Sequence, residues 1–330
     1  MHVMYSKGLR ALVWSAAALS AFPASVAAND WRPERNIEVI VGVSPGGPLD
    51  ATARMIQKFL ESRTPPLSAS VMNKAGGGHV IAMTYLNQRP GDGHFIAMAL
   101  PNLITNRIIG ANPLTYTDVT PLALLASEYI GMSVRADSPL KTGKDLLARL
   151  RADPGSLTFA ITSRASGNHI AAGAVLKAAG IDLKRVKFVS FKGAAETTVA
   201  VLGGHVDVVM ATPTSAWRHV QAGKLRMLAV TAPKRLGGEV ASVPTWKELG
   251  VNAVSANWRS VVGPRGLTAA QVAWWDQAFG AMVKSVDWQE AIRNNQWEDE
   301  YLNSANTVKF MREESKLLET LLTELGDAKK

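Results

Sequence analysis

The sequence contains no cysteine. This absence excludes disulfide bonds and thiolate metal sites, so the stability of the fold has to come from packing. Histidine does not supply a metal site in its place, because none of the six histidines stands in an H-E-x-x-H frame or at another metal-ligand spacing. The sequence therefore predicts a protein without a bound metal.

Nucleotide-binding motifs are also absent. Neither the G-x-G-x-x-G spacing of dinucleotide-binding folds nor a Gly-Lys-Ser/Thr phosphate loop occurs. Runs of basic residues are lacking too: the formal charge of +9 comes from residues scattered along the chain. Nucleic-acid binding is not expected from such a pattern, although the charge favours anionic partners. We expect no cofactor and no nucleic acid.

No apolar segment reaches the ~20 residues that a membrane-spanning helix needs. The apolar segment 11–22 instead follows Lys7 and Arg10 and precedes the small residues Val26, Ala27 and Ala28, with no acidic residue before position 29. These are the three regions of a secretory signal peptide. We expect residues 1–28 to be removed and the mature protein to be periplasmic.

Short apolar strands alternate with helical patterns over most of the remaining chain, which is typical of βαβ units and mostly parallel sheets. Two segments, 120–135 and 227–254, interrupt the alternation and predict two crossings between lobes. The fold class expected is therefore α/β with two lobes. We expect one lobe to contain residues 29–127 and 231–330, with a helical end, and the other to contain residues 128–230. The tryptophans near Trp274 have the spacing of a helix core.

The first lobe has two glycine-rich loops between a strand and a helix. Glycine lets backbone N–H groups approach a ligand closely, and the start of a helix favours an anion. Asp50 is open to a second interpretation, as a carboxylate that only caps the helix. Asn102, after a third strand, is a weaker candidate. The candidate ligand residues of this lobe are Pro45, Gly46, Gly47, Asp50, Gly76, Gly77, Gly78 and Asn102.

The second lobe has a polar loop after the strand that ends near Ile161. Ser166 or Asn168 can cap the following helix, or the serines and the loop amides can hold a carboxylate while Arg164 neutralises a second one. The candidates in this lobe are Ser163, Arg164, Ser166, Gly167, His169, Lys192, Gly193 and Thr212. A hydrolase built on Ser163 or Ser166 with His169 and a remote Asp is the enzymatic alternative, but we expect no G-x-S-x-G elbow in this chain.

The order of several short motifs resembles the Bug family, the periplasmic receptors of tripartite tricarboxylate transporters. These motifs are Trp31-Arg32-Pro33, Pro45-Gly46-Gly47 with Asp50, Asn73, Asp92-Gly93, Ser163 to His169, Lys192-Gly193, Gly203-Gly204 with Asp207, Ala222-Gly223-Lys224-Leu225, Val243-Pro244-Thr245 and Trp258. The resemblance implies a two-lobed, type II-like binding protein that closes on a small carboxylate, a di- or tricarboxylate or an aromatic acid. It also implies delivery to membrane permease subunits, a monomer and no enzymatic activity.

Two departures from the family pattern carry expectations. Arg164 is not a family fixture, so we expect it to select ligands with two carboxylates. His79 stands where the family usually has glycine, so we expect its backbone to avoid the left-handed region. A receptor that presents its ligand to a sensor kinase stays open as an alternative, because the sequence does not distinguish the two outputs.

Overall fold

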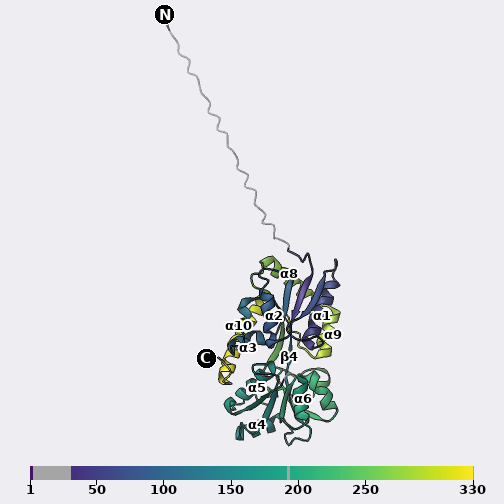
Figure 1. The fold of residues 1–330 in the computed structure, drawn as a ribbon, viewed down its shortest axis with the longest axis vertical. Helices are drawn as coiled ribbons and strands as arrows, with labels where there is room; N and C mark the ends of the chain where they lie inside the picture. The colour runs from purple at the N-terminus through teal and green to yellow at the C-terminus, as the bar shows by residue number, and fades with distance from the viewer. Residues whose placement is uncertain (3–30, 192–193, 330) are drawn as a thin grey trace. The chain divides into compact units, whose positions relative to one another are not determined.

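The structure is a computed structural model that describes residues 1–2, 31–191 and 194–329. The chain divides into residues 1–30 and the unit Trp31–Lys330. The expected signal peptide, apart from its first two residues, lies outside the described residues. Residues from Trp31 onward form two lobes, each built on its own β-sheet (Figure 1). The two-lobed α/β fold is thereby confirmed.

The first lobe contains a six-stranded sheet in the order β11-β4-β10-β3-β1-β2. Its strands β1 (Ile37–Val41), β2 (Ala69–Asn73) and β3 (Phe95–Ala99) run parallel. The other three, β4 (Val119–Tyr129), β10 (Ala256–Pro264) and β11 (Leu302–Asn303), join by antiparallel pairing. The sheet is thus parallel where the predicted ligand loops begin and antiparallel where the chain crosses between lobes.

The second lobe contains a five-stranded sheet in the order β7-β6-β8-β5-β9. Strands β6 (Thr158–Ile161), β7 (Lys187–Ser190) and β8 (Val208–Ala211) are parallel, whereas β5 (Gly131–Arg135) and β9 (Leu225–Val230) pair antiparallel with their neighbours. Both sheets are therefore mixed, and the parallel part in each is the part that precedes the predicted ligand loops.

Helices cover both faces of each sheet, because alternate strand residues are buried on opposite sides. In the first lobe, α1 (Pro48–Glu61), α8 (Ala269–Met282) and α9 (Val286–Asn295) share one apolar cluster, and α2 (Val80–Asn87), α3 (Asn102–Ile108) and α10 (Ser304–Glu324) contribute to another. In the second lobe, α4 (Gly143–Ala152) and α5 (Gly167–Ala178) lie on one face and α6 (Ala194–Leu202) and α7 (Pro213–Gln221) on the other. Trp275 and Phe279 of α8 are buried and stacked, as a core role predicts.

The chain crosses between the lobes twice, first from β4 to β5 and then on the way into β10. Arg259 of β10 donates to Glu128 of β4 at 2.6 Å, and both side chains are buried, so an ion pair joins the two crossing strands. Loss of either side chain would destabilise the protein, because it would leave the other charge buried and uncompensated.

The expected return to the first lobe at residue 231 is wrong. Val230 N–H donates to Pro244 O, and Trp246 N–H donates to Val230 O. Trp246 also packs against Gly143 of α4, and Leu236 and Val243 belong to an apolar cluster of the second lobe. Leu236 and Val243 of this irregular segment are buried with the second-lobe sheet, so the return occurs at β10.

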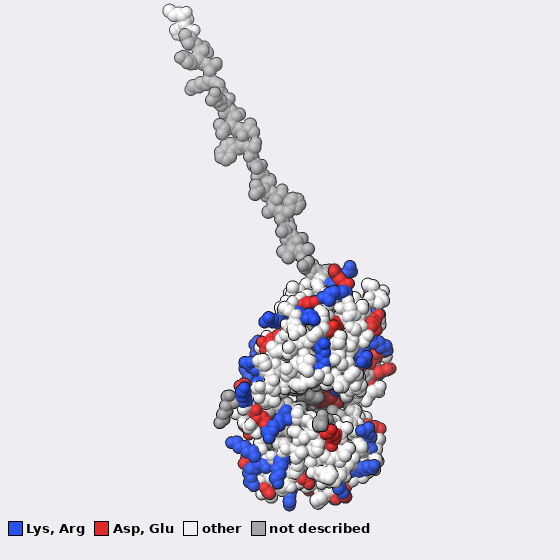
Figure 2. Space-filling view, in the orientation of Figure 1, with Lys and Arg blue, Asp and Glu red and all other residues white. Residues whose placement is uncertain are grey.

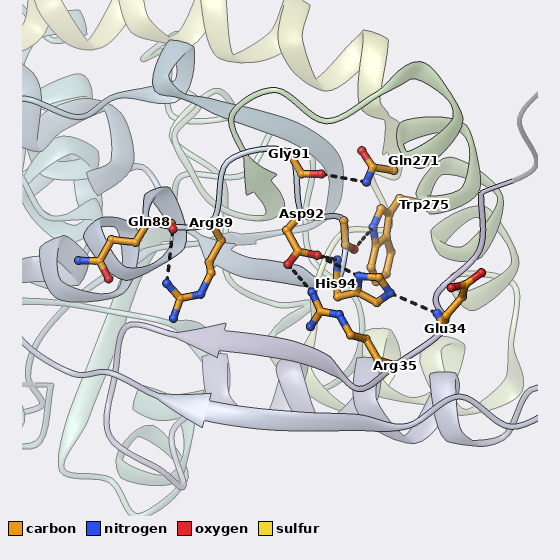
Figure 3. A network of polar contacts seen from close by, with 10 residues as sticks. Glu34, Arg35, Gln88, Arg89, Gly91, Asp92, His94, Gln271 and Trp275 are labelled. Atoms are coloured by element: carbon orange, nitrogen blue, oxygen red, sulfur yellow. Dashed lines mark hydrogen bonds and ion pairs between the residues drawn. The ribbon is translucent and has the colours of Figure 1, made fainter.

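The amino-terminal end of β3 is held by a polar network around the Asp92-Gly93 turn (Figure 3). Asp92 accepts from the backbone and ring of His94 at 3.1 and 2.9 Å and forms an ion pair with Arg35. A Cβ on Gly93 would lie 2.8 Å from the Trp31 ring. Burial alone would raise the pKa of Asp92, but its hydrogen bonds with His94 and Arg35 outweigh that effect and lower it. This motif shapes the sheet at the end opposite the ligand loops.

Candidate functional site

The predicted ligand loops lie at the carboxyl ends of the parallel strands in both lobes. Strands β1, β2 and β3 lead into the first-lobe loops, and β6, β7 and β8 lead into the second-lobe loops. Because carboxyl ends of parallel strands meet at one edge of a sheet, each set of loops gathers at one edge. Figure 2 shows the surface hollowed between the two lobes, where such edges would face a ligand.

The loop after β1 is organised by Asp50 in the first turn of α1. The buried Asp50 carboxylate accepts from Gly46 N–H at 2.9 Å, from Arg54 Nε at 2.9 Å and from Asn73 Nδ2 at 2.9 Å. Burial alone would raise the pKa of Asp50, but the hydrogen bonds from Arg54, Gly46 and Asn73 lower it to about 2. Asp50 is thus a loop organiser, while Pro45 and Gly46 are exposed and α1 has no side-chain cap among the described residues.

The loop after β2 has a run of left-handed residues. Gly76, Gly77, Gly78 and His79 have φ angles of 133°, 58°, 60° and 75°. The expectation that His79 avoids the left-handed region is wrong. Its imidazole is buried against Gly42, where a Cβ would lie 2.6 Å from the ring, and this packing offsets the backbone cost. Burial lowers the pKa of His79 to about 4.

One turn of α3 connects the two lobes. Asn102 and Asn106 each donate to the carbonyl oxygen of Gly78 at 2.7 Å, which fixes the glycine loop of the first lobe. Thr105, between them, donates to the carbonyl oxygen of Ala165 in the second-lobe loop at 3.0 Å. The predicted loops of the two lobes therefore meet the same helix. Asn102 is used as a support for Gly78, a role that the sequence did not indicate.

The loop after β6 contains a serine that caps α5 and an arginine that forms an ion pair with a distant aspartate. The Ser166 hydroxyl caps α5, accepting from His169 N–H at 3.5 Å and donating to Ser163 O at 2.7 Å. Ser163 is exposed. Arg164 forms an ion pair with Asp327, a residue just beyond α10 that sequence analysis did not single out. His169 is buried, with Nδ1 lying 3.3 Å from the same carboxylate.

Gly167 and Thr212 lie at the starts of helices α5 and α7. Thr212 caps α7 and accepts from Ser215 N–H at 3.4 Å. A Cβ on Gly167 would lie 2.9 Å from Asn257 Oδ1 of β10, so a crossing strand borders the start of α5. Asn257 was missed because its polar side chain stands alone on a strand. Lys192 and Gly193 lie outside the described residues.

A further serine matches a hydrolase spacing that sequence analysis passed over. Gly42, Ser44 and Gly46 fit G-x-S-x-G, between β1 and α1. The elbow requires a strained turn at the serine, but Ser44 is not among the described residues with positive φ. No hydrogen bond between Ser44 and a histidine is present in the described part of the chain, although the His79 ring lies against Gly42. The geometry does not assemble a nucleophile and base.

Two further properties concern only the residues that the structure describes. They contain no group of three or more His, Cys, Asp or Glu side chains arranged to hold a metal ion. They also include no helix with the length and apolarity needed to cross a membrane.

The chain is similar to proteins of one known family. Residues 53–326 match the model of the tripartite tricarboxylate transporter family receptor. A UPF0065 protein from Cupriavidus necator is 30% identical over 99% of this chain and 98% of its own length. BugT from Bordetella pertussis is 26% identical over 76% of each chain. A solved R. palustris protein with adipate has a TM-score of 0.76, is 25% identical, and aligns over 90% of this chain and 99% of its own.

The family match extends across both lobes and includes the second-lobe loop, α3 and all of α10. The Cupriavidus necator relative extends the similarity to nearly the whole chain. The resemblance indicated by the short sequence motifs is therefore confirmed, and this chain belongs to the receptor family of tripartite tricarboxylate transporters.

Proposed function

We propose that this protein is a periplasmic receptor that captures a small carboxylate and delivers it to the permease subunits of a tripartite transporter. It would act as a monomer and without catalysing a reaction. The observation that carries the proposal is the bond from Thr105 to Ala165, which joins the helix supporting the first-lobe glycine loop to the second-lobe loop. Membership in the receptor family supports the same conclusion.

The proposed recognition uses backbone N–H groups at helix starts. The exposed glycines of both first-lobe loops let a carboxylate approach the backbone, and the unpaired N–H groups of α1 and α5 favour negative charge. Asp50 would act indirectly, by fixing Gly46. The proposed ligand residues are Pro45, Gly46, Gly47, Gly76, Gly77, Gly78, Ser163, Ser166, Gly167, Lys192, Gly193 and Thr212, with His169 and Asn102 as supports.

The ligand class we favour is a dicarboxylate. The R. palustris relative was solved with adipate, a six-carbon diacid. Arg164 supplies a positive charge beside α5, and its side chain is 68% exposed although Asp327 holds one edge of the guanidinium. A second ligand carboxylate could therefore reach the open edge of Arg164. Aromatic monoacids and tricarboxylates are the alternatives that the experiment below separates.

A thermal-shift screen of the mature chain tests the function, with adipate, malate, citrate, benzoate, nicotinate and aspartate as probes. A bound acid should stabilise the protein by about 2.7 kcal/mol at a concentration of 100 Kd. Incubation followed by analysis of the acids should return each unchanged. If esters and amides offered in parallel are hydrolysed, a hydrolase based on Ser163 or Ser166 with His169 replaces the receptor. No shift with any acid would overturn the proposal.

A matched pair of variants locates the site. Gly47 has φ −85° and ψ 169° and caps α1, and no described atom lies within 4 Å of an added Cβ, so Gly47→Asp fits the fold as a normal N-cap. Its carboxylate would occupy the N–H groups and repel the ligand. Gly237→Asp is the control, because Gly237 is also an extended N-cap with free space, outside the proposed loops. We expect G47D to lose the ligand shift and G237D to keep it.

A further inference from the structure

Ala165 adopts an unfavourable backbone conformation at the centre of the second-lobe ligand loop. Its φ is 57°, and the residue is buried directly before Ser166, the cap of α5. A left-handed conformation is strained for a residue with a Cβ, and it persists only where neighbouring contacts over-determine it. The conformation of the loop therefore depends on what holds Ala165.

Both backbone polar groups of Ala165 are held by side chains. Its N–H donates to Nδ1 of His169 at 3.1 Å, and its carbonyl oxygen accepts from the hydroxyl of Thr105 at 3.0 Å. Thr105 and His169 are themselves buried, so neither bond competes with bulk water. Thr105 belongs to α3 in the first lobe, and His169 belongs to α5 in the second.

The end of the chain completes this arrangement. Asp327 lies just beyond α10, with its side chain only 3% exposed. One carboxylate oxygen forms an ion pair with Arg164, and the other lies 3.3 Å from Nδ1 of His169. Nδ1 of His169 already accepts from the Ala165 N–H, so it donates no hydrogen bond to this oxygen, and the carboxylate acts on the loop through Arg164, the residue before Ala165.

The segment that carries Asp327 is fixed to the first lobe. Its own N–H donates to Leu322 O at 2.9 Å, and Lys329 N–H donates to Ile108 O of α3 at 2.9 Å. Along α10 itself, the contact with the second lobe is extended by the ion pair of Glu324 with Lys177 of α5, at 2.7 Å. The carboxyl-terminal segment thus bridges α3 and α5.

We propose that Asp327 is a positioning residue for the ligand loop. Through its ion pair with Arg164, and together with the bonds that Ala165 makes with Thr105 and His169, it holds Ala165 in the left-handed conformation, so that the first N–H groups of α5 are fixed before the ligand arrives. Preorganisation of this kind improves affinity because less order has to be created on binding. The consequence for affinity rests on the proposed function, whereas the conformation itself does not.

Hydrogen–deuterium exchange of the free protein tests the proposal without a ligand. Asp327→Asn keeps the shape of the side chain and removes its charge. We expect the amides of residues 165–170 to exchange about tenfold faster in D327N than in the wild type, because local opening becomes easier. Glu324→Gln is the matched control, since it removes a carboxylate from the same helix end, and the ion pair of Glu324 is with Lys177 of α5. E324Q should leave these amides unchanged.

Two more variants separate positioning from general support. Thr105→Val removes the other holding bond and should speed exchange of the same amides, which also covers the case that D327N folds poorly. Ala165→Gly removes the cost of the left-handed conformation, so D327N should change exchange less in an A165G background. Unchanged exchange in a folded D327N variant, or an equal effect of D327N in both backgrounds, would overturn the proposal. If the loop responds as expected but no acid binds, only the proposed function fails.

Discussion

The imidazole of His79 packs directly against Gly42, beneath the first-lobe loops: a Cβ on Gly42 would lie 2.6 Å from Cγ and Nδ1 of His79. His79 is buried there with a φ of 75°. The absence of a side chain at the end of β1 therefore allows an imidazole to fill the gap behind the glycine loop. This contact explains why a residue with a Cβ is stable in a conformation that glycine adopts more easily.

Gly42→Ala should destabilise the protein by about 1–3 kcal/mol, because the added methyl group overlaps a buried ring attached to a constrained backbone. Urea unfolding at neutral pH measures the change. Gly237→Ala is the control, because that residue has an extended backbone and no described atom within 4 Å of its added Cβ. A G42A variant as stable as G237A would contradict the packing described.

The stability of the protein should fall as the pH is lowered from about 6.5 to about 4. Burial lowers the pKa of both His79 and His169 to about 4, the latter with opposing effects of Asp327 and Arg164. Between these pH values the unfolded chain therefore binds protons that the folded protein does not. The free energy of unfolding should fall by about 1 kcal/mol for each imidazole per pH unit of acidification. Urea unfolding at pH 7.5 and pH 5 measures the slope. His79→Asn, which tolerates the left-handed region, should reduce it, and an unchanged slope would exclude His79 as a contributor.

Asp50→Asn should lower the free energy of unfolding by about 1–3 kcal/mol at neutral pH. Both carboxylate oxygens of Asp50 accept hydrogen bonds from Gly46, Arg54 and Asn73, whereas an amide has only one oxygen that can accept. The pKa of Asp50 is lowered from 3.8 to about 2. Its contribution is therefore complete above about pH 4 and disappears as the pH falls through 2. Asp287→Asn, in an exposed pair with Lys58, should change stability little at any pH. Equal effects of the two substitutions would show that Asp50 does not organise the loop.

Arg164→Ala should weaken binding of diacids more than binding of monoacids, because the second carboxylate loses a charge-assisted partner. Calorimetric titration with acids that shift the melting temperature measures both losses. Arg185→Ala removes another arginine of the same lobe, whose partner is Asp153 in an exposed pair, and should change neither affinity. An equal loss for both classes would leave Arg164 only its structural contact with Asp327.

Local patterns predicted the elements of the fold well. The alternation of short apolar strands with helical patterns predicted the βα order, the strand expected to end near Ile161 is β6, and the tryptophan spacing of α8 predicted a buried helix. Glycine-rich segments predicted the loops between β1 and α1 and between β2 and α2, and their role in ligand binding stays a prediction. The boundary of the second lobe could not be predicted in this way, because residues 232–253 form little regular structure and their place is decided by burial against Val230 and Gly143.

The sequence by itself determined the α/β class, the two crossings and the position of glycine-rich loops at helix starts, since each of these follows from contacts between residues close in the chain. Only the tertiary structure decided which side chains support those loops. Asp327 reaches Arg164 and His169, and Thr105 reaches Ala165, across separations that no local pattern records. The left-handed backbone of His79 was likewise decided by packing, because the burial of its ring against Gly42 outweighs the local preference of the residue.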